Sequence, residues 1–229
     1  MGRSHLSARE PVSRVRALQA AVDLADEEGV DAVSMRRLAA RLGVVPMALY
    51  KHVVNKDDLL GGMVDTVIGE YAAPGVGADW KAAVRDRVLS ARKAVARHPW
   101  ARSVIESRST RTAAVLGHLD AVSGAFLGGG LSPDLTHHAM HALGHRVWGF
   151  SPEAFDDSAD PGALRLPADP DEQQQLVDRM RSTYPHITAI ALDSGGACDA
   201  DFEFEWALDL LLDAVGRLHE AGWVSPRRR

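Results

Sequence analysis

The sequence predicts an all-α protein. In almost every periodic segment apolar residues recur at intervals of three and four, as Val15, Leu18, Val22 and Ala25 do, which is the spacing of one face of a helix. The alternation of apolar and polar residues that is typical of a half-buried strand does not occur, and no internal repeat is evident. Glycine and proline residues, which interrupt helices, separate these segments. We therefore expect a succession of helices without a sheet.

Capping residues indicate where the first two helices begin and end. Residues 7–10 (SARE), followed by Pro11, have the pattern of a capping box with an early proline, so the first helix is expected to begin near there. Gly29 is expected to end it. Ser34 is a candidate N-cap for the second helix, and Gly43 is a candidate left-handed C-cap.

The next two helices are short and closely spaced. Pro46 lies where a third helix would start, and a helix over 45–52 is too short to be stable alone, so Leu49 is expected to anchor it inward. Residues 55–58 (NKDD) are expected to cap a fourth helix. Two short helices joined by a turn at Gly43 form the helix-turn-helix arrangement. The second helix is expected to direct four apolar side chains inward: Met35, Leu38, Ala39 and Leu42.

A break at Pro74, Gly75 and Gly77 is the best candidate for a domain boundary. We expect a helix-turn-helix domain over 1–73 and a larger helical domain over 74–229. Residues 151–170 contain four prolines among aspartates and predict a loop. The remaining helical segments are expected at 79–98, directly after Pro99, and at 110–127, 132–150, 171–184 and 201–221.

Composition limits the classes of protein to which the chain could belong. It has 229 residues, 46% of them hydrophobic, which is enough for a sizeable core. A single cysteine, Cys198, cannot form an internal disulfide, and no apolar run reaches the roughly 18 residues of a membrane span. We therefore expect a cytoplasmic protein without a membrane partner. The net charge of −5 argues against a protein that coats nucleic acid uniformly.

Positive charge is nevertheless concentrated locally. Between residues 32 and 56 there is no acidic residue, and five cations occur: Arg36, Arg37, Arg41, Lys51 and Lys56. A cluster of this kind is usually a solvated helical face. Here it coincides with a turn glycine and a helix that is too short to stand alone, and the combination favours contact with a phosphate backbone.

The same segment resembles the DNA-binding domain of the TetR family of transcriptional repressors. The motifs that carry the resemblance are "SMRRLAARLGV" at 34–44, "ALYKHV" at 48–53 and "NKDDLL" at 55–60. More weakly, the remainder resembles the tetracycline-repressor-like C-terminal ligand-binding domain, in the segments "ARHPWARSVIESR", "GGGLSPDLTHHAMHALGHRVWGF" and "FEFEWALDLLLDAVGRL". The resemblance implies a transcription regulator and not an enzyme, without a cofactor or a catalytic residue.

The resemblance also implies roles for individual residues. Ser34 matches a position whose hydroxyl binds a phosphate, and Arg36 a position that reaches guanine in the major groove. The apolar base-facing positions, which can contact thymine methyl groups, are Val45, Pro46, Met47 and Ala48. Pro46 departs from the polar residue of some members, so no operator sequence can be borrowed. The expected phosphate clamp is Tyr50, Lys51, His52 and Lys56, although Tyr50 and His52 could instead be structural. Met35 completes the DNA-facing set.

The last helix indicates self-association. From 206 to 218 it is apolar on nearly every face, so it needs cover on more than one side. A thick monomeric core could provide that cover. The resemblance instead implies that this helix and the segment 136–150 form a four-helix interface in a homodimer with two-fold symmetry. Such a dimer would bind a near-palindromic operator in double-stranded DNA.

Histidines are concentrated in the segment 137–145. His137, His141 and His145 recur at intervals of four and fall on one helical face, where they could ligate a metal. No carboxylate lies within the run to act as a general base, so we expect histidines that line a pocket or an interface, and no metal. A helical metal-dependent hydrolase built on these residues is the competing interpretation, and an architectural DNA binder without a ligand is a third.

A sensor pocket for a small-molecule effector is expected in the larger domain. Aromatic and methionine side chains offer an adaptable apolar wall, while a histidine or arginine orients the ligand. Each candidate could equally belong to an ordinary core. The candidate lining residues are Trp100, Arg102, His118, Met140, His141 and Trp148. The hypothesis is a ligand-responsive repressor whose helix at 55 onward moves the DNA-binding heads out of register when the effector binds.

Overall fold

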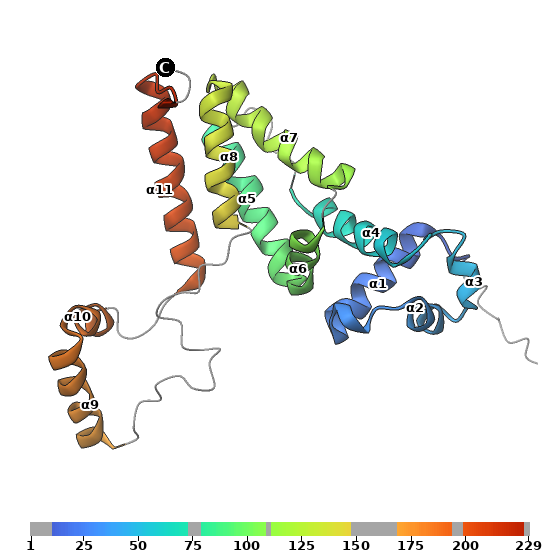
Figure 1. Cartoon of the computed structure of the whole chain (residues 1–229), viewed down its shortest axis with the longest axis horizontal. Helices are drawn as coiled ribbons and strands as arrows, with labels where there is room; N and C mark the ends of the chain where they lie inside the picture. The colour runs from blue at the N-terminus through green and yellow to red at the C-terminus, as the bar shows by residue number, and fades with distance from the viewer. Residues whose placement is uncertain (1–10, 73–78, 109–110, 148–168, 194–198, 227–229) are drawn as a thin grey trace, which may run out of the picture.

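The computed structural model of the chain describes residues 11–72, 79–108, 111–147, 169–193 and 199–226. Within these ranges the regular structure consists of eleven α-helices and one short 3₁₀-helix, and no strand (Figure 1). The predicted all-α class is therefore confirmed. None of the described helices combines the length and the apolar character that a bilayer crossing requires.

The N-terminal helices follow the predicted order. Their bounds are α1 Arg14–Glu28, η1 Val30–Ala32, α2 Met35–Leu42, α3 Pro46–Leu49 and α4 Lys56–Gly69. The expected start of the first helix near Pro11 is wrong, because Pro11 precedes α1 and the N-cap is Ser13, whose Oγ accepts a hydrogen bond from the Arg16 N–H at 3.2 Å. The third helix is also shorter than the expected 45–52, since α3 proper ends at Leu49.

Four of the predicted capping residues are confirmed. Gly29 ends α1 with a φ of 83°, and Gly43 ends α2 in the left-handed region with a φ of 68° and a ψ of 36°. The Ser34 side chain caps α2, and Asn55 Oδ1 accepts the Asp58 N–H at 2.8 Å at the start of α4. These caps satisfy backbone donors that a helix end leaves unpaired. They also set the directions of α2 and α4 around the short α3.

One hydrophobic core joins α1, α2, α3 and α4 to α6 (Pro99–Ser107). α1 and α4 approach so closely that a Cβ on Gly62 would lie 2.5 Å from Leu18 Cδ2, so a larger residue there would displace the Leu18 side chain. α6 contributes Trp100, Ala101 and Val104 to the same core. A helix that follows the predicted domain boundary in the chain therefore packs with the helices that precede it. The boundary residues 73–78 lie outside the described residues, so the division at 73/74 remains a prediction.

A second core lies within the larger half, among α5 (Trp80–Arg97), α7 (Ala113–Gly128), α8 (Pro133–Val147) and α11 (Ala200–Glu220). Its largest fully buried side chains are Phe126, Leu208 and Leu212. Carboxylates spaced four residues apart on α11 form ion pairs with cations of α5. The pairs are Asp201–Arg92, Glu205–Arg85, Asp209–Arg85 and Asp213–Lys81. The predicted helices over 79–98, 110–127, 132–150 and 201–221 correspond to these four elements within a few residues at each end.

The segment before α11 holds one helix more than the sequence predicted. α9 spans Pro170–Thr183 and α10 spans Pro185–Asp193, whereas a single helix over 171–184 was expected. Pro185 ends the first helix at the preceding residue, but it also occupies the first turn of the next, where proline is tolerated. The two helices pack on each other and lie apart from the other helices in Figure 1. Most of the predicted loop at 151–170 lies outside the described residues.

Candidate nucleic-acid interface and ligand cavity

The turn between α2 and α3 is built by backbone hydrogen bonds around Gly43. The Gly43 N–H bonds the Ala40 carbonyl at 3.1 Å, and the Val44 N–H reaches back to the Ala39 carbonyl at 3.0 Å. This pattern closes a helix whose C′ residue is left-handed. Pro46 then occupies the first turn of α3, where its missing N–H costs nothing. The turn therefore presents α3 at a defined angle to α2.

α3 is held in place by neighbours and not by its own length. Leu49 and Val53 are fully buried beneath it. The Arg14 guanidinium donates to the His52 carbonyl at 2.7 Å and forms two hydrogen bonds with the Asp58 carboxylate, at 2.7 and 3.0 Å. Asp58 also accepts the Val54 N–H at 2.8 Å. Arg14 on α1 and Asp58 on α4 thus hold the segment that directly follows α3, a role that was not predicted from the sequence.

The outer face of α3 is exposed and mainly apolar. Val45 is 66% exposed, Met47 71% and Tyr50 46%, whereas Ala48 is half-buried. Tyr50 therefore does not pack under the helix. Of the other predicted contacts, Met35 is partly buried against the N-terminal core, and the Ser34 Oγ accepts the Arg37 N–H at 3.3 Å. That hydroxyl keeps its own hydrogen for donation.

The predicted positive face is smaller than the sequence indicated. Arg37 forms an ion pair with Glu28 at 2.5 Å, and Arg41 forms one with Glu27 at 2.6 Å. Both acids lie on α1, outside the acid-free stretch, and helix packing brings them beside α2. The Arg41 hydrogen bond holds the pKa of Glu27 below its usual range against the opposing effect of desolvation. The cations of the stretch without an ion pair among the described residues are Arg36, Lys51 and Lys56.

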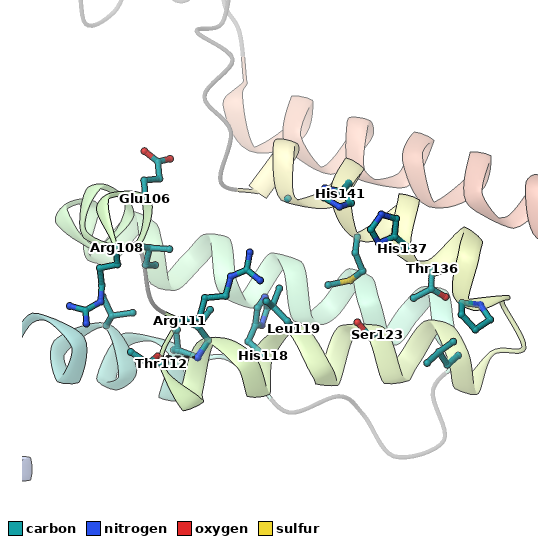
Figure 2. Close-up of a pocket in the computed structure, with 18 residues that line it drawn as sticks. Glu106, Arg108, Arg111, Thr112, His118, Leu119, Ser123, Thr136, His137 and His141 are labelled. Atoms are coloured by element: carbon teal, nitrogen blue, oxygen red, sulfur yellow. Dashed lines mark hydrogen bonds between the residues drawn. The ribbon is translucent and has the colours of Figure 1, made fainter. Parts of the chain in front are cut away.

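A cavity of about 780 Å³ lies between α4, α6, α7 and α8 (Figure 2). One side of α4 contributes Val64 and Ile68 to its wall. The apolar lining from the other helices includes Ile105, Val115, Leu119, Leu127 and Met140. The polar lining consists of Glu106, Arg108, Arg111, Thr112, His118, Ser123, Thr136, His137 and His141. A volume of this size and a mainly apolar wall with a few polar groups are typical of small-molecule sites.

The six predicted pocket residues are divided between several places. His118, Met140 and His141 line the cavity. Trp100 does not, because its indole N–H donates to Asp26 Oδ1 at 2.6 Å and its ring is buried in the N-terminal core. Arg102 also lies outside the lining, and its guanidinium pairs with Glu106 at 2.9 Å. Trp148 lies outside the described residues.

His118 is a neutral imidazole with a defined tautomer. Its Nδ1 accepts a hydrogen bond from Arg87 Nε at 3.2 Å, so its proton resides on Nε2. Burial lowers the pKa of His118 to about 4, and the nearby Arg87 charge acts in the same direction. The Tyr71 ring contacts it edge-on with centroids 5.1 Å apart. At neutral pH the cavity therefore contains a hydrogen-bonding group here and not a charge.

The structure describes the side chains of two of the three histidines that the spacing places on one helical face. His137 and His141 have ring centroids 4.6 Å apart, and both side chains are exposed at the rim of the cavity. The side chain of His145 lies outside the described part of the structure. Among the described residues no group of three or more His, Cys, Asp or Glu side chains is placed to hold a metal ion.

Most of the lining residues were not anticipated from the sequence, and three polar ones among them bear on the chemistry of the cavity. Arg108 follows α6, Arg111 precedes α7, and Thr136 is buried on α8. Two of their polar atoms, Arg108 Nε and Thr136 Oγ1, are buried without a hydrogen-bond partner among the described residues. A buried polar atom without a hydrogen-bond partner is a signal that could have identified these residues. The sequence does not show this signal, because burial is known only once α4, α6, α7 and α8 have packed.

A second apolar surface lies on the outside of the larger half, between α8 and α11. A groove of about 600 Å³ there is lined by Ala139, Ala142, Leu211, Ala214 and Leu218, among others. Beside it on α11, Trp206 and Leu210 are 55% and 51% exposed. Contiguous exposed apolar area of this kind marks interaction surfaces in soluble proteins.

Comparisons with known proteins agree with both halves of the chain. The family model described as "Bacterial regulatory proteins, tetR family" matches residues 17–63, and that described as "Tetracyclin repressor-like, C-terminal domain" matches residues 73–217. The HTH-type transcriptional repressor DrrR1 of Streptomyces coeruleorubidus is 28% identical over 207 residues, which cover 87% of this chain and 76% of that protein. The tetracycline repressor protein class G of Vibrio anguillarum is 28% identical over 208 residues, covering 89% and 93%. Among solved structures, the Streptomyces coelicolor TetR family protein ActR in complex with actinorhodin has a TM-score of 0.67 at 25% identity and covers 90% of this chain and 98% of that chain.

Proposed function

The chain belongs to the TetR family of bacterial transcriptional regulators, and we propose that it is a dimeric repressor that a small organic effector releases from its operator. Proteins of this family are regulators and not enzymes. The hydrolase interpretation of the histidine segment is therefore dropped. The described cavity favours an effector-responsive regulator over an architectural DNA binder, which has no use for a lined pocket.

One observation supports the proposal above the others: α4 belongs to both sites. Its N-terminal end carries Lys56 and, through Asp58, the anchor of α3. Further along the same helix, toward its C-terminal end, Val64 and Ile68 form part of the cavity wall. A ligand that fills the cavity better when α4 is displaced shifts the population away from the DNA-binding state, and it shifts nothing without such a difference in affinity. The similar ActR is a TetR family protein whose structure was solved in complex with actinorhodin, and another relative is named a tetracycline repressor.

The DNA contacts that we propose divide into two kinds. Arg36 and the apolar residues Val45, Pro46, Met47 and Ala48 would contact base edges, with Met35 behind them. The remaining residues would contact the phosphate backbone and set the position of α3: Ser34, Tyr50, Lys51, His52 and Lys56. The residues of this set that are exposed, and so accessible to DNA, include Arg36, Val45, Pro46, Met47, Tyr50, Lys51 and Lys56.

We propose the groove between α8 and α11 as the homodimer interface. An isologous contact would place α8 and α11 of one protomer against the same helices of a second copy. The exposed Trp206, Leu210 and Leu218 of α11 would be covered in this way. The two α3 helices would then enter successive major grooves, about 34 Å or a multiple of that apart, on a near-palindromic site.

An electrophoretic mobility shift assay tests the regulatory function. Purified protein is titrated into promoter fragments from its own and neighbouring genes at moderate salt, with a tenfold or greater excess of unrelated competitor DNA. At least one fragment is expected to be retarded at a protein concentration at which coding-region DNA of equal length is not. If every promoter fragment behaves like the coding-region control, the proposed repressor function is wrong.

A further inference from the structure

Arg108 lies where the cavity meets the N-terminal end of α4. Its Nη1 donates to the Asp57 carbonyl at 3.0 Å and to Asp57 Oδ1 at 2.9 Å, and its Nη2 donates to Oδ2 at 3.1 Å. One turn along α4, a Cβ on Gly61 would lie 3.1 Å from Arg108 Nη2, so the glycine makes room for the guanidinium. Asp57, Gly61, Val64 and Ile68 share one face of α4. That face therefore runs from the Arg108 contact into the cavity wall.

The remaining edge of the Arg108 guanidinium has a donor to offer. Asp57 occupies the end formed by Nη1 and Nη2, whereas Nε is buried and has no hydrogen-bond partner among the described residues. The Arg108 side chain is 13% exposed and lines the cavity. A guanidinium presents five N–H donors in one plane. Its Nε side can donate to a second oxyanion while the Nη1 and Nη2 groups donate to the first. Leaving Nε unpaired is costly, so a ligand acceptor there is favourable.

The surrounding charges favour an anion. Arg111 lines the same half of the cavity and has no ion pair among the described residues. Glu106, the acidic lining residue, has its carboxylate paired with Arg102. His118 is neutral, as described above. Positive charge therefore exceeds negative charge at the end of the cavity near α4.

The rest of the cavity requires an apolar molecule with a polar far end. Figure 2 shows Arg108 and Thr136 at opposite ends, with His118 and Leu119 between them. Val115, Leu119, Leu127 and Met140 provide an apolar wall, and Thr136 Oγ1 is buried without a partner in the described residues.

We propose that the effector is an elongated, mainly apolar organic anion whose carboxylate or sulfonate binds the Nε side of Arg108, with Arg111 close by. The proposal rests on the regulatory function and specifies its ligand. Because Arg108 also holds Asp57, the effector anion and the first turn of α4 share one positive charge. Binding of the effector weakens the grip of Arg108 on Asp57 and so loosens α4, next to the DNA-contacting Lys56. By linkage, loss of the Asp57 charge must strengthen effector binding to the same extent.

Two fluorescent probes of similar size test the anion site. Anilinonaphthalene sulfonate is an aromatic anion, and Nile red is an uncharged aromatic. In fluorescence titrations of the full chain, Arg108→Met is expected to weaken binding of the sulfonate by about tenfold or more, and Arg111→Met by about threefold, since Arg111 is more exposed. Arg108→Lys, which keeps the charge but loses the planar fork, should fall between Arg108→Met and the wild type. Nile red affinity should change less than about twofold in each variant, which also shows that the cavity has kept its shape.

The matched control is Lys93→Met. Lys93 is an exposed cation of α5 that does not line the cavity, so this variant changes the net charge equally and should leave the affinity for the sulfonate unaltered. Equal sulfonate affinity in wild type, Arg108→Met and Arg111→Met would overturn the proposal. An equal loss of affinity for both probes would also overturn it, because the loss would then reflect a damaged cavity and not a missing charge.

Asp57→Asn tests the shared charge. We expect it to increase sulfonate affinity about three- to tenfold, because Arg108 then no longer pairs with the Asp57 carboxylate. A purely structural role for the pair would not predict an increase. Unchanged or weaker binding contradicts the link. The regulatory function is judged separately, by the DNA retardation assay without a probe. If DNA is retarded but probe affinity does not depend on Arg108, only this inference is refuted. If DNA is not retarded but probe affinity does depend on Arg108, only the repressor function is refuted.

Discussion

Three cations, Arg36, Lys51 and Lys56, carry the positive charge around the outer face of α3. Arg37 and Arg41 lie in the same stretch of sequence, but their charges are neutralised by Glu28 and Glu27. Exposed pairs of this kind add little to stability. Their main effect is electrostatic. Because these two arginines are paired, the positively charged surface that would face DNA is smaller than the number of basic residues indicates.

Substitution of single cations separates base contacts from phosphate contacts. Arg36→Ala should cost about 1–3 kcal/mol of binding free energy on the operator and relax base preference at one position. Lys56→Ala should weaken binding to all sequences and reduce the slope of log K against log salt by about one. Arg37→Ala is the control, and it should change affinity less than about threefold because its charge is already paired. Fluorescence anisotropy on operator variants at several salt concentrations measures all three, and a uniform loss across sequences for Arg36→Ala would refute this division.

The buried His118 makes stability depend on pH in a defined direction. The pKa of His118 is lowered to about 4 in the folded protein from its ordinary value of 6.5, by burial and by the Arg87 charge. Between these values the unfolded chain binds a proton that the folded chain does not, so the free energy of unfolding falls as the pH drops from 6.5 toward 4. The full effect is at most about 3 kcal/mol. Above pH 6.5 it vanishes, because both states are then neutral.

His118→Gln keeps a polar side chain that does not titrate. Urea unfolding at a series of pH values measures the free energy of unfolding of wild type and variant. The difference between the two should grow as the pH falls below about 6.5. The difference between the two proteins cancels the contributions of the carboxylates, which both proteins share. Parallel curves for the two proteins over this range would show that His118 is not protected from protonation in the folded state.

Among the elements, α3 is the clearest case of a helix stabilised by its neighbours. Four helical residues cannot hold a helix in isolation. Leu49 and Val53 provide buried contacts beneath it, and Arg14 of α1 links the His52 carbonyl, which lies just beyond α3, to Asp58 of α4. A displacement of α4 therefore acts directly on α3.

The link between Arg14 and Asp58 is open to a double-mutant cycle. Arg14→Met and Asp58→Asn should show a coupling of about 0.5–1 kcal/mol in the free energy of unfolding, a modest value because the two side chains are partly exposed. Both variants should also lower affinity for all DNA sequences equally, since α3 loses its fixed position but no base contact. The Arg14 hydrogen bond, helped by the Val54 N–H, holds the pKa of Asp58 below 3.8, so the coupling should be present above pH 3.8 and decline below it. A coupling indistinguishable from zero at neutral pH would contradict the role of the pair.

At the scale of the whole molecule, α11 has three distinct faces. One face is buried against α5, α7 and α8 through residues such as Leu208 and Leu212. A second carries the carboxylates that pair with α5. The third, with Trp206, Leu210 and Leu218, is exposed beside the groove on α8. A single chain leaves this third face uncovered, which favours association with a second copy.

Leu210→Glu tests the dimer. Leu210 is 51% exposed in the single chain, so the variant should keep its fold while the buried charge breaks the proposed interface. Sedimentation velocity is expected to show a monomer at micromolar concentration, with operator affinity reduced by about a hundredfold because the two half-sites are no longer bound by one particle. The matched control is Leu116→Glu on α7, where a leucine is 52% exposed away from the groove. A dimeric Leu210→Glu protein would refute this interface.

Local signals explain why the helices could be predicted and why their ends sometimes could not. Gly29, Ser34, Gly43 and Asn55 act through their own backbone or through side chains within three residues, so the sequence alone is sufficient to identify them. The start of α1 was misplaced because residues 7–10 also have the pattern of a capping box, whereas the observed N-cap is Ser13. The separate α10 was missed because a proline that ends one helix can equally begin the next.

The helical class, the capped helix-turn-helix and the family could be predicted from the residues alone, because periodicity, caps and motifs are properties of neighbours along the chain. Helix packing was needed to show that α1 neutralises two of the five cations, that Trp100 is part of the N-terminal core, and that Arg108 lies between the cavity and α4. Each of these depends on residues far apart in sequence. Charge pairing and burial are set by distance in space, and distance in space is known only after the helices have packed.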